Sequence, residues 1–169
     1  MSGWRHARAI LLLPGNVNVT IPALVLVLVE GPRIGWGLDG VAGVAVAALG
    51  LALICAGFSM WLWTVVLFDR VGRGTLATWD PTSRLVVTGP YCHVRNPMIS
   101  GVAVLLSGEA VFFGSPWIGL WAAIFVTVNH LYFVFAEEPG LERRFGAEYV
   151  SYREAVPRWV PRRSPWRPR

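Results

Sequence analysis

Long apolar stretches alternate with short polar ones along the chain. Four apolar segments cover residues 9–29, 41–68, 98–113 and 117–136. A helix needs about 20 apolar residues to cross the hydrocarbon core of a bilayer. The pattern therefore predicts an all-α, polytopic membrane protein with about four transmembrane helices. The chain is expected to form a single integral membrane domain over residues 1–169.

The last two apolar segments are separated only by Gly114, Ser115 and Pro116. So tight a turn predicts that they form an antiparallel helical hairpin. Both open ends of a hairpin lie on the same side of the membrane. The loop that ends at Pro97 and the stretch that begins at Glu137 are therefore expected to meet.

Composition supports a membrane protein over a soluble one. Hydrophobic residues make up 54% of the chain and charged residues 15%, against roughly 25% charged residues in soluble domains. The mean hydropathy is +0.51. The net charge is +5, and every basic residue is arginine. Beside such apolar segments, this charge indicates contact with anionic lipids and not with nucleic acid.

Arginine-rich and arginine-poor connections alternate along the chain. Two arginines precede the first apolar segment, four lie in residues 69–97 and eight follow the fourth segment, whereas the other two connections hold one and none. By the positive-inside rule, both termini and the 69–97 loop face the cytoplasm. We expect this topology in the inner membrane of a prokaryote. The Arg- and Pro-rich tail after Pro157 is expected to be extended against lipid headgroups.

The loop before the hairpin is the first candidate for chemistry. Its sequence over residues 83–97 is SRLVVTGPYCHVRNP. Pro97 suits the first turn of a helix, whose free N–H groups and positive dipole end favour a carboxylate or a phosphate. The alternative is a connecting loop whose arginines hold lipid headgroups.

Two adjacent carboxylates, Glu137 and Glu138, follow the hairpin. Such a carboxylate could hold an ammonium group, a pair of ribose hydroxyls or an arginine; a solvated helix end or an ion pair with Arg95 or Arg84 is the alternative. Glu137 follows His130 by seven residues, or about two turns, so both are expected on one helix face. Glu138 is then rotated by about 100°, toward a neighbouring helix or headgroups.

The stretch over residues 141–157 places aromatic and apolar side chains at helical spacing, with Arg and Glu on the opposite face. It predicts one interfacial amphipathic helix, which would anchor the protein or cover a pocket. The apolar face consists of Leu141, Phe145, Tyr149 and Tyr152.

Glu109 and His130 are ionisable residues within apolar segments, and such residues are functional candidates by default. At about 1.5 Å per residue they differ in depth by roughly 10 Å or more, so they are not expected to be partners. His130 lies nearer the cytoplasmic end, where it could face a reaction centre. Cys55 and Cys92 form no zinc or disulfide pattern, so no metal site is expected.

Two motifs together resemble a known group of families. GPYCHVRNP at residues 89–97, followed by EE-x-x-L-x-x-x-F-G-x-x-Y-x-x-Y-x-x-x-V-P at residues 137–157, is similar to the isoprenylcysteine carboxyl methyltransferase and phospholipid methyltransferase families. The similarity extends over residues 80–161. It implies methyl transfer from S-adenosylmethionine, with S-adenosylhomocysteine as product, to a lipid-like or prenylated small acceptor at the cytoplasmic membrane face.

The resemblance also implies site residues. His130 and Arg95 are the candidate catalytic residues. The cofactor-binding residues carried over by position are Ser83, Arg84, Leu85, Val86, Tyr91, Asn96, Pro97, Met98, Ile99 and Glu137.

The chain departs from the family's eukaryotic members at three positions. Asn96 and Ile99 stand where they carry His and Tyr, and Phe133 replaces an Arg implicated in substrate handling. The acceptor therefore stays open. Two other functions are compatible with the sequence. An NADPH-dependent membrane reductase could use Arg84 and Arg95 for phosphates, and a non-enzymatic scaffold would not need the loop and Glu137 to meet.

Overall fold

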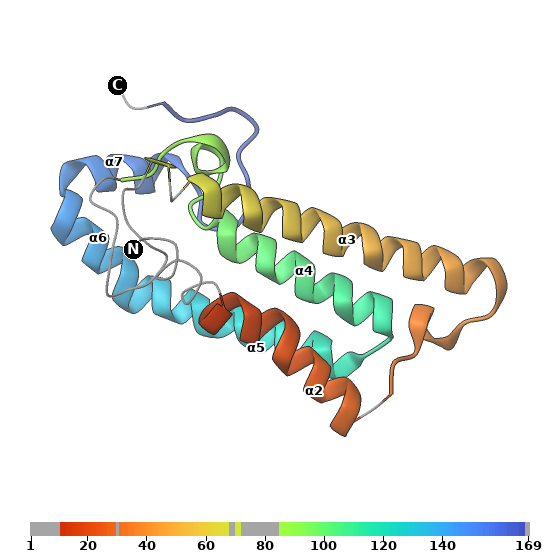
Figure 1. The fold of residues 1–169 in the computed structure, drawn as a ribbon. Helices are drawn as coiled ribbons and strands as arrows, with labels where there is room; N and C mark the ends of the chain where they lie inside the picture. Colours follow the sequence, from red (N-terminus) through yellow and green to blue (C-terminus); the bar gives the residue numbers. More distant parts are fainter. Residues whose placement is uncertain (1–10, 30, 68–69, 72–84, 168–169) are drawn as a thin grey trace.

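The computed structural model describes residues 11–29, 31–67, 70–71 and 85–167. These residues are helical or irregular, with no strand among them, so the predicted all-α class is confirmed. The helices run side by side as an elongated bundle, with two short helices and the C-terminal segment at one end (Figure 1). In chain order the elements are η1 (Leu11–Thr20), α2 (Ile21–Leu28), η2 (Ile34–Gly37), α3 (Gly40–Leu67), η4 (Gly89–Cys92), α4 (Pro97–Phe113), α5 (Pro116–Tyr132), η5 (Phe133–Glu137), α6 (Glu138–Phe145) and α7 (Ala147–Ala155).

Helices α3 and α4 approach one another closely along a line of small residues. On α3, Gly50 and Gly57 are buried, and on α4, Gly101 and Gly108 are buried. A Cβ atom on Gly57 would lie only 2.5 Å from the carbonyl oxygen of Gly101. Glycine therefore lets the two backbones touch, which is how helices commonly associate where no water drives them together.

Helices α4 and α5 form the predicted hairpin. Gly114 ends α4 with φ of +62°, a left-handed conformation that favours glycine. Ser115 then begins α5, because its hydroxyl accepts a 3.2 Å hydrogen bond from the backbone N–H of Ile118. A turn this short makes the two helices antiparallel neighbours.

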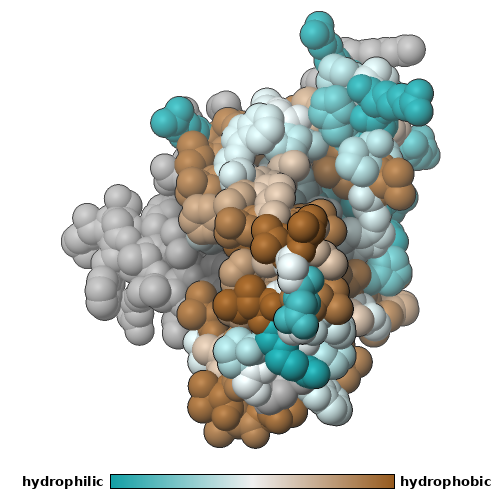
Figure 2. Space-filling model, turned by 90° about the vertical axis from the view of Figure 1, so that its right-hand side faces the viewer, coloured by the Kyte–Doolittle hydropathy of each residue, from teal (hydrophilic) through white to brown (hydrophobic). Residues whose placement is uncertain are grey.

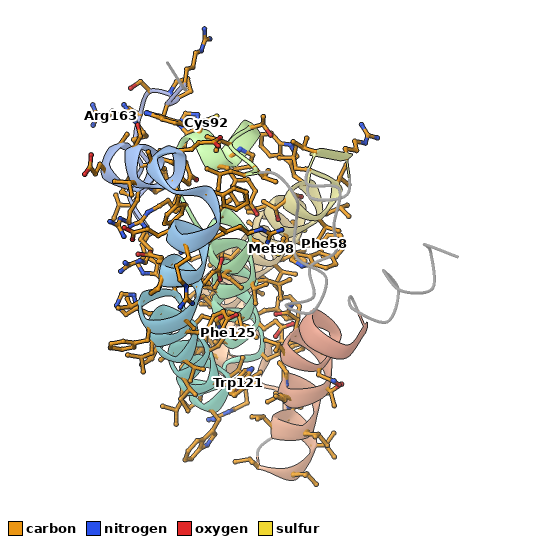
Figure 3. All side chains as sticks on the ribbon, turned by 90° about the vertical axis from the view of Figure 1, so that its left-hand side faces the viewer. Phe58, Cys92, Met98, Trp121, Phe125 and Arg163 are labelled. Carbon is orange, nitrogen blue, oxygen red and sulfur yellow. The ribbon has the colours of Figure 1, made fainter. Side chains whose placement is uncertain are left out.

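The N-terminal segment closes the other side of the bundle. The indole N–H of Trp121 on α5 donates a 3.1 Å hydrogen bond to the carbonyl oxygen of Val17 in η1. A hydrophobic cluster at this contact fixes the two segments against α4, and Figure 3 shows two of its members, Trp121 and Phe125, on the side of α5 toward α2. The cluster consists of Val102, Leu106 and Ala122, with Val17, Trp61, Trp121 and Phe125 packed against them.

Two helices are long and apolar enough to cross a membrane: α3 and the continuous run Pro116–Phe145. Many large hydrophobic side chains on them are exposed, as lipid contact requires, for example Val44, Phe58 and Ile124. Figure 2 shows hydrophobic areas over much of one face, with a large hydrophilic group at the top and a smaller one in the lower middle. Helix α4 has 17 residues and is shorter than these two.

The predicted single interfacial helix is in fact two, α6 and α7. The break lies at Gly146, whose φ of +55° and ψ of −131° suit glycine alone. The predicted apolar face is nevertheless present, since Tyr149 and Tyr152 are buried together with Val156 in one cluster. Leu141 and Phe145 pack against that cluster, so the break changes the direction of the chain without scattering its aromatic residues.

Candidate active site

The loop before α4 meets the segments that follow α5, as the hairpin predicts. In Figure 1 this loop (green) lies against α7 and the C-terminal segment (blue) at one end of the bundle. The backbone N–H of Arg95 donates a 2.9 Å hydrogen bond to the carbonyl oxygen of Pro157. The hydroxyl of Tyr152 donates a 2.8 Å hydrogen bond to the carbonyl oxygen of Tyr91. Residues about 60 positions apart in the chain thus form one site.

The helix that carries the two carboxylates widens just before them. Residues Phe133–Glu137 form a π-helical turn between α5 and α6. Such a turn closes hydrogen bonds to the fifth residue and not the fourth, so it holds one residue more than an α-helical turn, and it is frequent at functional sites. The extra residue brings Glu138, and not Glu137, into line with His130. Neighbouring residues of the C-terminal segment contact both: Arg158 binds Glu138, and Trp159 binds His130.

Glu138 is at the centre of a buried cluster of charges. Its Oε1 accepts hydrogen bonds from Nη1 of Arg95 at 2.8 Å and from Nε of Arg158 at 2.7 Å. Its Oε2 accepts one from Nη2 of Arg158 at 2.9 Å. The side chain of Glu138 is only 12% exposed. Glu138 thus forms the ion pair with Arg95 that the sequence offered as the alternative, and its second arginine comes from the C-terminal segment and not from lipid headgroups.

Glu137 has a different environment from its neighbour. It is half-buried, and within the part of the chain that the structure describes no side chain donates a hydrogen bond to it. Burial, then Tyr152, then the charge of Glu137 raise the pKa of the Tyr91 phenol well above its usual range. Glu137 therefore lies near Tyr91, and Tyr91 is a neutral hydroxyl at physiological pH. The pair of adjacent carboxylates is divided into one that binds arginines and one that does not.

Arg95 retains one side-chain hydrogen-bond donor that binds no other described residue. Its side chain is 11% exposed, and its Nε is buried with no acceptor among the described residues. Tyr149 lies beside it: burial and the charge of Glu138 raise the pKa of that phenol, while its hydrogen bond with Arg95 lowers it. A buried N–H without an acceptor is costly unless a ligand or water supplies one.

Comparison with known proteins identifies the family. The family model described as phospholipid methyltransferase matches residues 44–148, which is more than half of the chain. The protein belongs to the phospholipid methyltransferase family. No curated protein and no solved structure matches the chain significantly.

The chain is a membrane methyltransferase of this family. The two long apolar helices agree with this assignment. The family match includes the loop before α4, the hairpin and both carboxylates. It ends at residue 148. Tyr149, Tyr152 and the whole C-terminal segment, which complete the site, therefore lie beyond the family-model match, although the two tyrosines belong to the motif at residues 137–157.

The other cofactor-binding residues that the resemblance implies lie in the loop or at the start of α4. Pro97 is the first residue of α4, and Asn96 precedes it. Ser83 and Arg84 lie outside the described residues. Among the others, Val86, Tyr91 and Pro97 are buried, and Leu85, Asn96, Met98 and Ile99 are half-buried.

The two candidate catalytic residues lie in separate surroundings. His130 accepts a 3.1 Å hydrogen bond at Nδ1 from the indole N–H of Trp159. Because an indole N–H can only donate, Nδ1 carries no proton and the neutral ring carries its hydrogen on Nε2. His130 is thus arranged as a hydrogen-bond donor. Arg95 belongs to the Glu138 cluster, and no contact between Arg95 and His130 is found in the described part of the chain.

Arg158 and Trp159 are site residues that sequence reasoning missed. They follow Pro157 in the Arg- and Pro-rich tail, which was expected to lie extended against headgroups. Their neighbours have no periodicity that would reveal a buried contact. One signal could have indicated them. Buried carboxylates need cationic partners, and the tail that follows the carboxylate pair is rich in arginine.

Proposed function

We propose that the protein transfers a methyl group from S-adenosylmethionine to a lipid-like or prenylated small acceptor at the cytoplasmic membrane face. Family membership supports the reaction class. The observation that carries the proposal is Glu137, a carboxylate beside Tyr91 to which no described side chain donates a hydrogen bond. A carboxylate of this kind is available to a ligand with cationic or hydroxyl groups.

The residues of the site fit this cofactor. S-adenosylmethionine carries an ammonium group, ribose hydroxyls and a carboxylate. The site offers Glu137 for one of the first two and the Nε–H of Arg95 for the third. Apolar side chains at the start of α4 and in the loop, Met98, Ile99 and Val86, would hold the adenine ring. A carboxylate and a guanidinium N–H that bind no other described side chain suit a zwitterion better than they suit the phosphates of NADPH.

The chain contributes alignment more than acid–base chemistry. When bound, the cofactor supplies an electrophilic methyl group on a sulfonium. Holding an acceptor in line with it can lower the barrier by about 7–11 kcal/mol. The Nε2–H of His130 would orient an oxygen of the acceptor, and the buried start of α4 would exclude water. A general base is needed only if the acceptor is an amine or a hydroxyl.

The proposal includes the arrangement of the protein in the membrane. Four spans would be formed by the η1–α2 segment, α3, α4 and the helix that begins with α5, with both termini in the cytoplasm. The alternating arginines support this orientation. The short α4 is compatible with it, because α3 and α5 both pack against α4. A reporter fused after Arg169 should be active in the cytoplasm; activity on the outer side would refute the orientation.

Titration calorimetry with S-adenosylhomocysteine, S-adenosylmethionine and NADPH tests the cofactor. We expect the wild-type protein to bind both adenosyl ligands more tightly than NADPH. Glu137→Gln should weaken S-adenosylhomocysteine binding by about tenfold or more, because a charge-assisted hydrogen bond is lost. Glu142→Gln is the matched control: Glu142 carries the same group on α6 but pairs with Arg153 at the surface.

The outcomes separate the hypotheses. Tighter binding of NADPH than of either adenosyl ligand would overturn the proposal in favour of a reductase. No binding of any of the three would favour a scaffold. If Glu137→Gln binds S-adenosylhomocysteine as well as the wild type does, the site is wrong at its best-supported residue. If the adenosyl ligands bind, methyl transfer from labelled cofactor into extracted membrane lipids would identify the acceptor class.

A further inference from the structure

The C-terminal segment is built into the site through its backbone. Residues 157–166, here called the strap, run back along the loop before α4. Two backbone hydrogen bonds of 2.9 Å follow the one from Arg95 to Pro157: Arg162 N–H donates to the carbonyl oxygen of His93, and Trp166 N–H to that of Cys92. Figure 3 shows Cys92 and Arg163 near one another at this end of the bundle. Backbone bonding repeated over ten residues indicates a fixed segment.

Side chains hold the strap in the same place. Nδ1 of His93 lies 2.8 Å from the carbonyl oxygen of Arg162. Nη1 of Arg162 donates a 3.0 Å hydrogen bond to the carbonyl oxygen of Ala155 at the end of α7. The ring of Trp166 packs on that of Tyr152, with centroids 5.5 Å apart. The strap is therefore anchored to α7 as well as to the loop.

Glu138 joins the strap to Arg95. Arg158 binds both carboxylate oxygens of Glu138, and Arg95 binds one of them. Bidentate arginine–carboxylate pairs fix orientation as well as supplying energy. Because Glu138 accepts three hydrogen bonds from arginines, its carboxylate binds protein groups and is not open to a ligand. Arg95, in contrast, is held by Nη1, by its backbone N–H and by its hydrogen bond with Tyr149, and its Nε–H has no acceptor in the described ranges.

The geometry points to Glu138 and Arg158 as positioning residues that fix the guanidinium of Arg95 for a ligand carboxylate, which makes the strap part of the binding site. The inference rests on the proposed function, since it assigns the ligand carboxylate to Arg95. It goes beyond the family-model match, which ends at residue 148, and beyond the motif that ends at Pro157, because Arg158 follows both. Neither Glu138 nor Arg158 touches the ligand; both act through Arg95.

A double-mutant cycle tests whether Glu138 acts through Arg95. We expect Glu138→Gln to weaken S-adenosylhomocysteine binding by about tenfold, since Arg95 loses its orienting charge. In an Arg95→Gln background, the same change should have almost no further effect. A residue that only stabilised the fold would weaken binding by the same factor in both backgrounds. Glu142→Gln again serves as the control and should bind like the wild type.

Arg158 provides the second arm of the experiment. Arg158→Lys keeps the charge but loses the bidentate geometry, so it should weaken S-adenosylhomocysteine binding by about threefold or more. It also keeps the inference testable if Glu138→Gln does not fold. Binding unchanged in Glu138→Gln or in Arg158→Lys would overturn the inference. So would equal effects of Glu138→Gln with and without Arg95. Failure of the wild type to bind S-adenosylhomocysteine would instead refute the proposed function.

Discussion

Replacing Gly57 by alanine tests the closest contact in the bundle. A Cβ atom at this position would lie 2.5 Å from both the Gly101 carbonyl oxygen and the Leu105 backbone nitrogen, and 2.9 Å from the Leu105 Cα. All three are backbone atoms of α4, so no side chain can rotate away. Favourable contacts between heavy atoms lie at about 3.5–4.0 Å. Helices α3 and α4 must therefore separate by about 1 Å locally.

The cost follows from this separation. Overpacking of a well-packed contact typically destabilises a protein by about 1–3 kcal/mol. Alanine in a helix regains roughly 0.5–1 kcal/mol over glycine. We expect Gly57→Ala to lower the free energy of unfolding by about 1–2 kcal/mol. Gly119→Ala is the matched control, because its Cβ would meet only the Ala110 side chain at an ordinary 3.8 Å; it should be neutral or slightly stabilising.

The assay is denaturant-induced unfolding in a mild detergent, followed by tryptophan fluorescence. The chain has nine tryptophans, so the signal reports on the whole bundle. The free energies of unfolding of the wild type and of the Gly57→Ala and Gly119→Ala variants are compared using the same dependence on denaturant concentration. If Gly57→Ala proves as stable as Gly119→Ala, then α3 and α4 do not touch through their backbones, and the packing of the bundle described above is wrong.

Three further predictions concern other parts of the molecule. Ser115→Ala removes the cap of α5 and should lower the free energy of unfolding in the same assay by about 1 kcal/mol; an unchanged value would contradict the cap. Trp159→Phe removes the indole N–H, so the chemical shift of His130 Nδ1 should change to that of a ring nitrogen without this donor, and an unchanged shift would refute the bond. Burial raises the pKa of both Tyr91 and Tyr152, so the unfolded chain loses these protons first. Thermal stability should fall as the pH rises above about 10, and less steeply in Tyr152→Phe; an equal decline would argue against buried phenols.

Local signals in the sequence were sufficient for the helices. The apolar segments expected at residues 98–113 and 117–136 correspond to α4 (Pro97–Phe113) and to α5 (Pro116–Tyr132) with its continuation. Hydrophobicity over a long window and a Gly–Ser–Pro turn are properties of neighbouring residues, and neither depends on the rest of the fold. The meeting of the loop with Glu137 followed from the hairpin alone.

Local sequence patterns do not predict contacts between distant segments. Counting residues on a regular helix placed Glu137 with His130, but the π-helical turn at Phe133–Glu137 cannot be recognised from local composition. The break at Gly146 was hidden because the aromatic spacing continues across it. The strap was read from its charge as a lipid contact, since nothing within the strap itself shows that Arg158 has a buried carboxylate as its partner.

The wide turn at Phe133–Glu137 also affects how insertions and deletions in this region should be interpreted. Because the turn holds one extra residue, the number of residues between His130 and Glu138 no longer predicts whether the two side chains lie on the same face of the helix. A chain with one residue fewer here could close the turn into a regular α-helix and still direct the second carboxylate at its arginines. Alignments that match the carboxylate pair without a gap would then misplace the histidine by one position. Equivalence between such chains is better assigned by what each side chain binds than by counting from the hairpin.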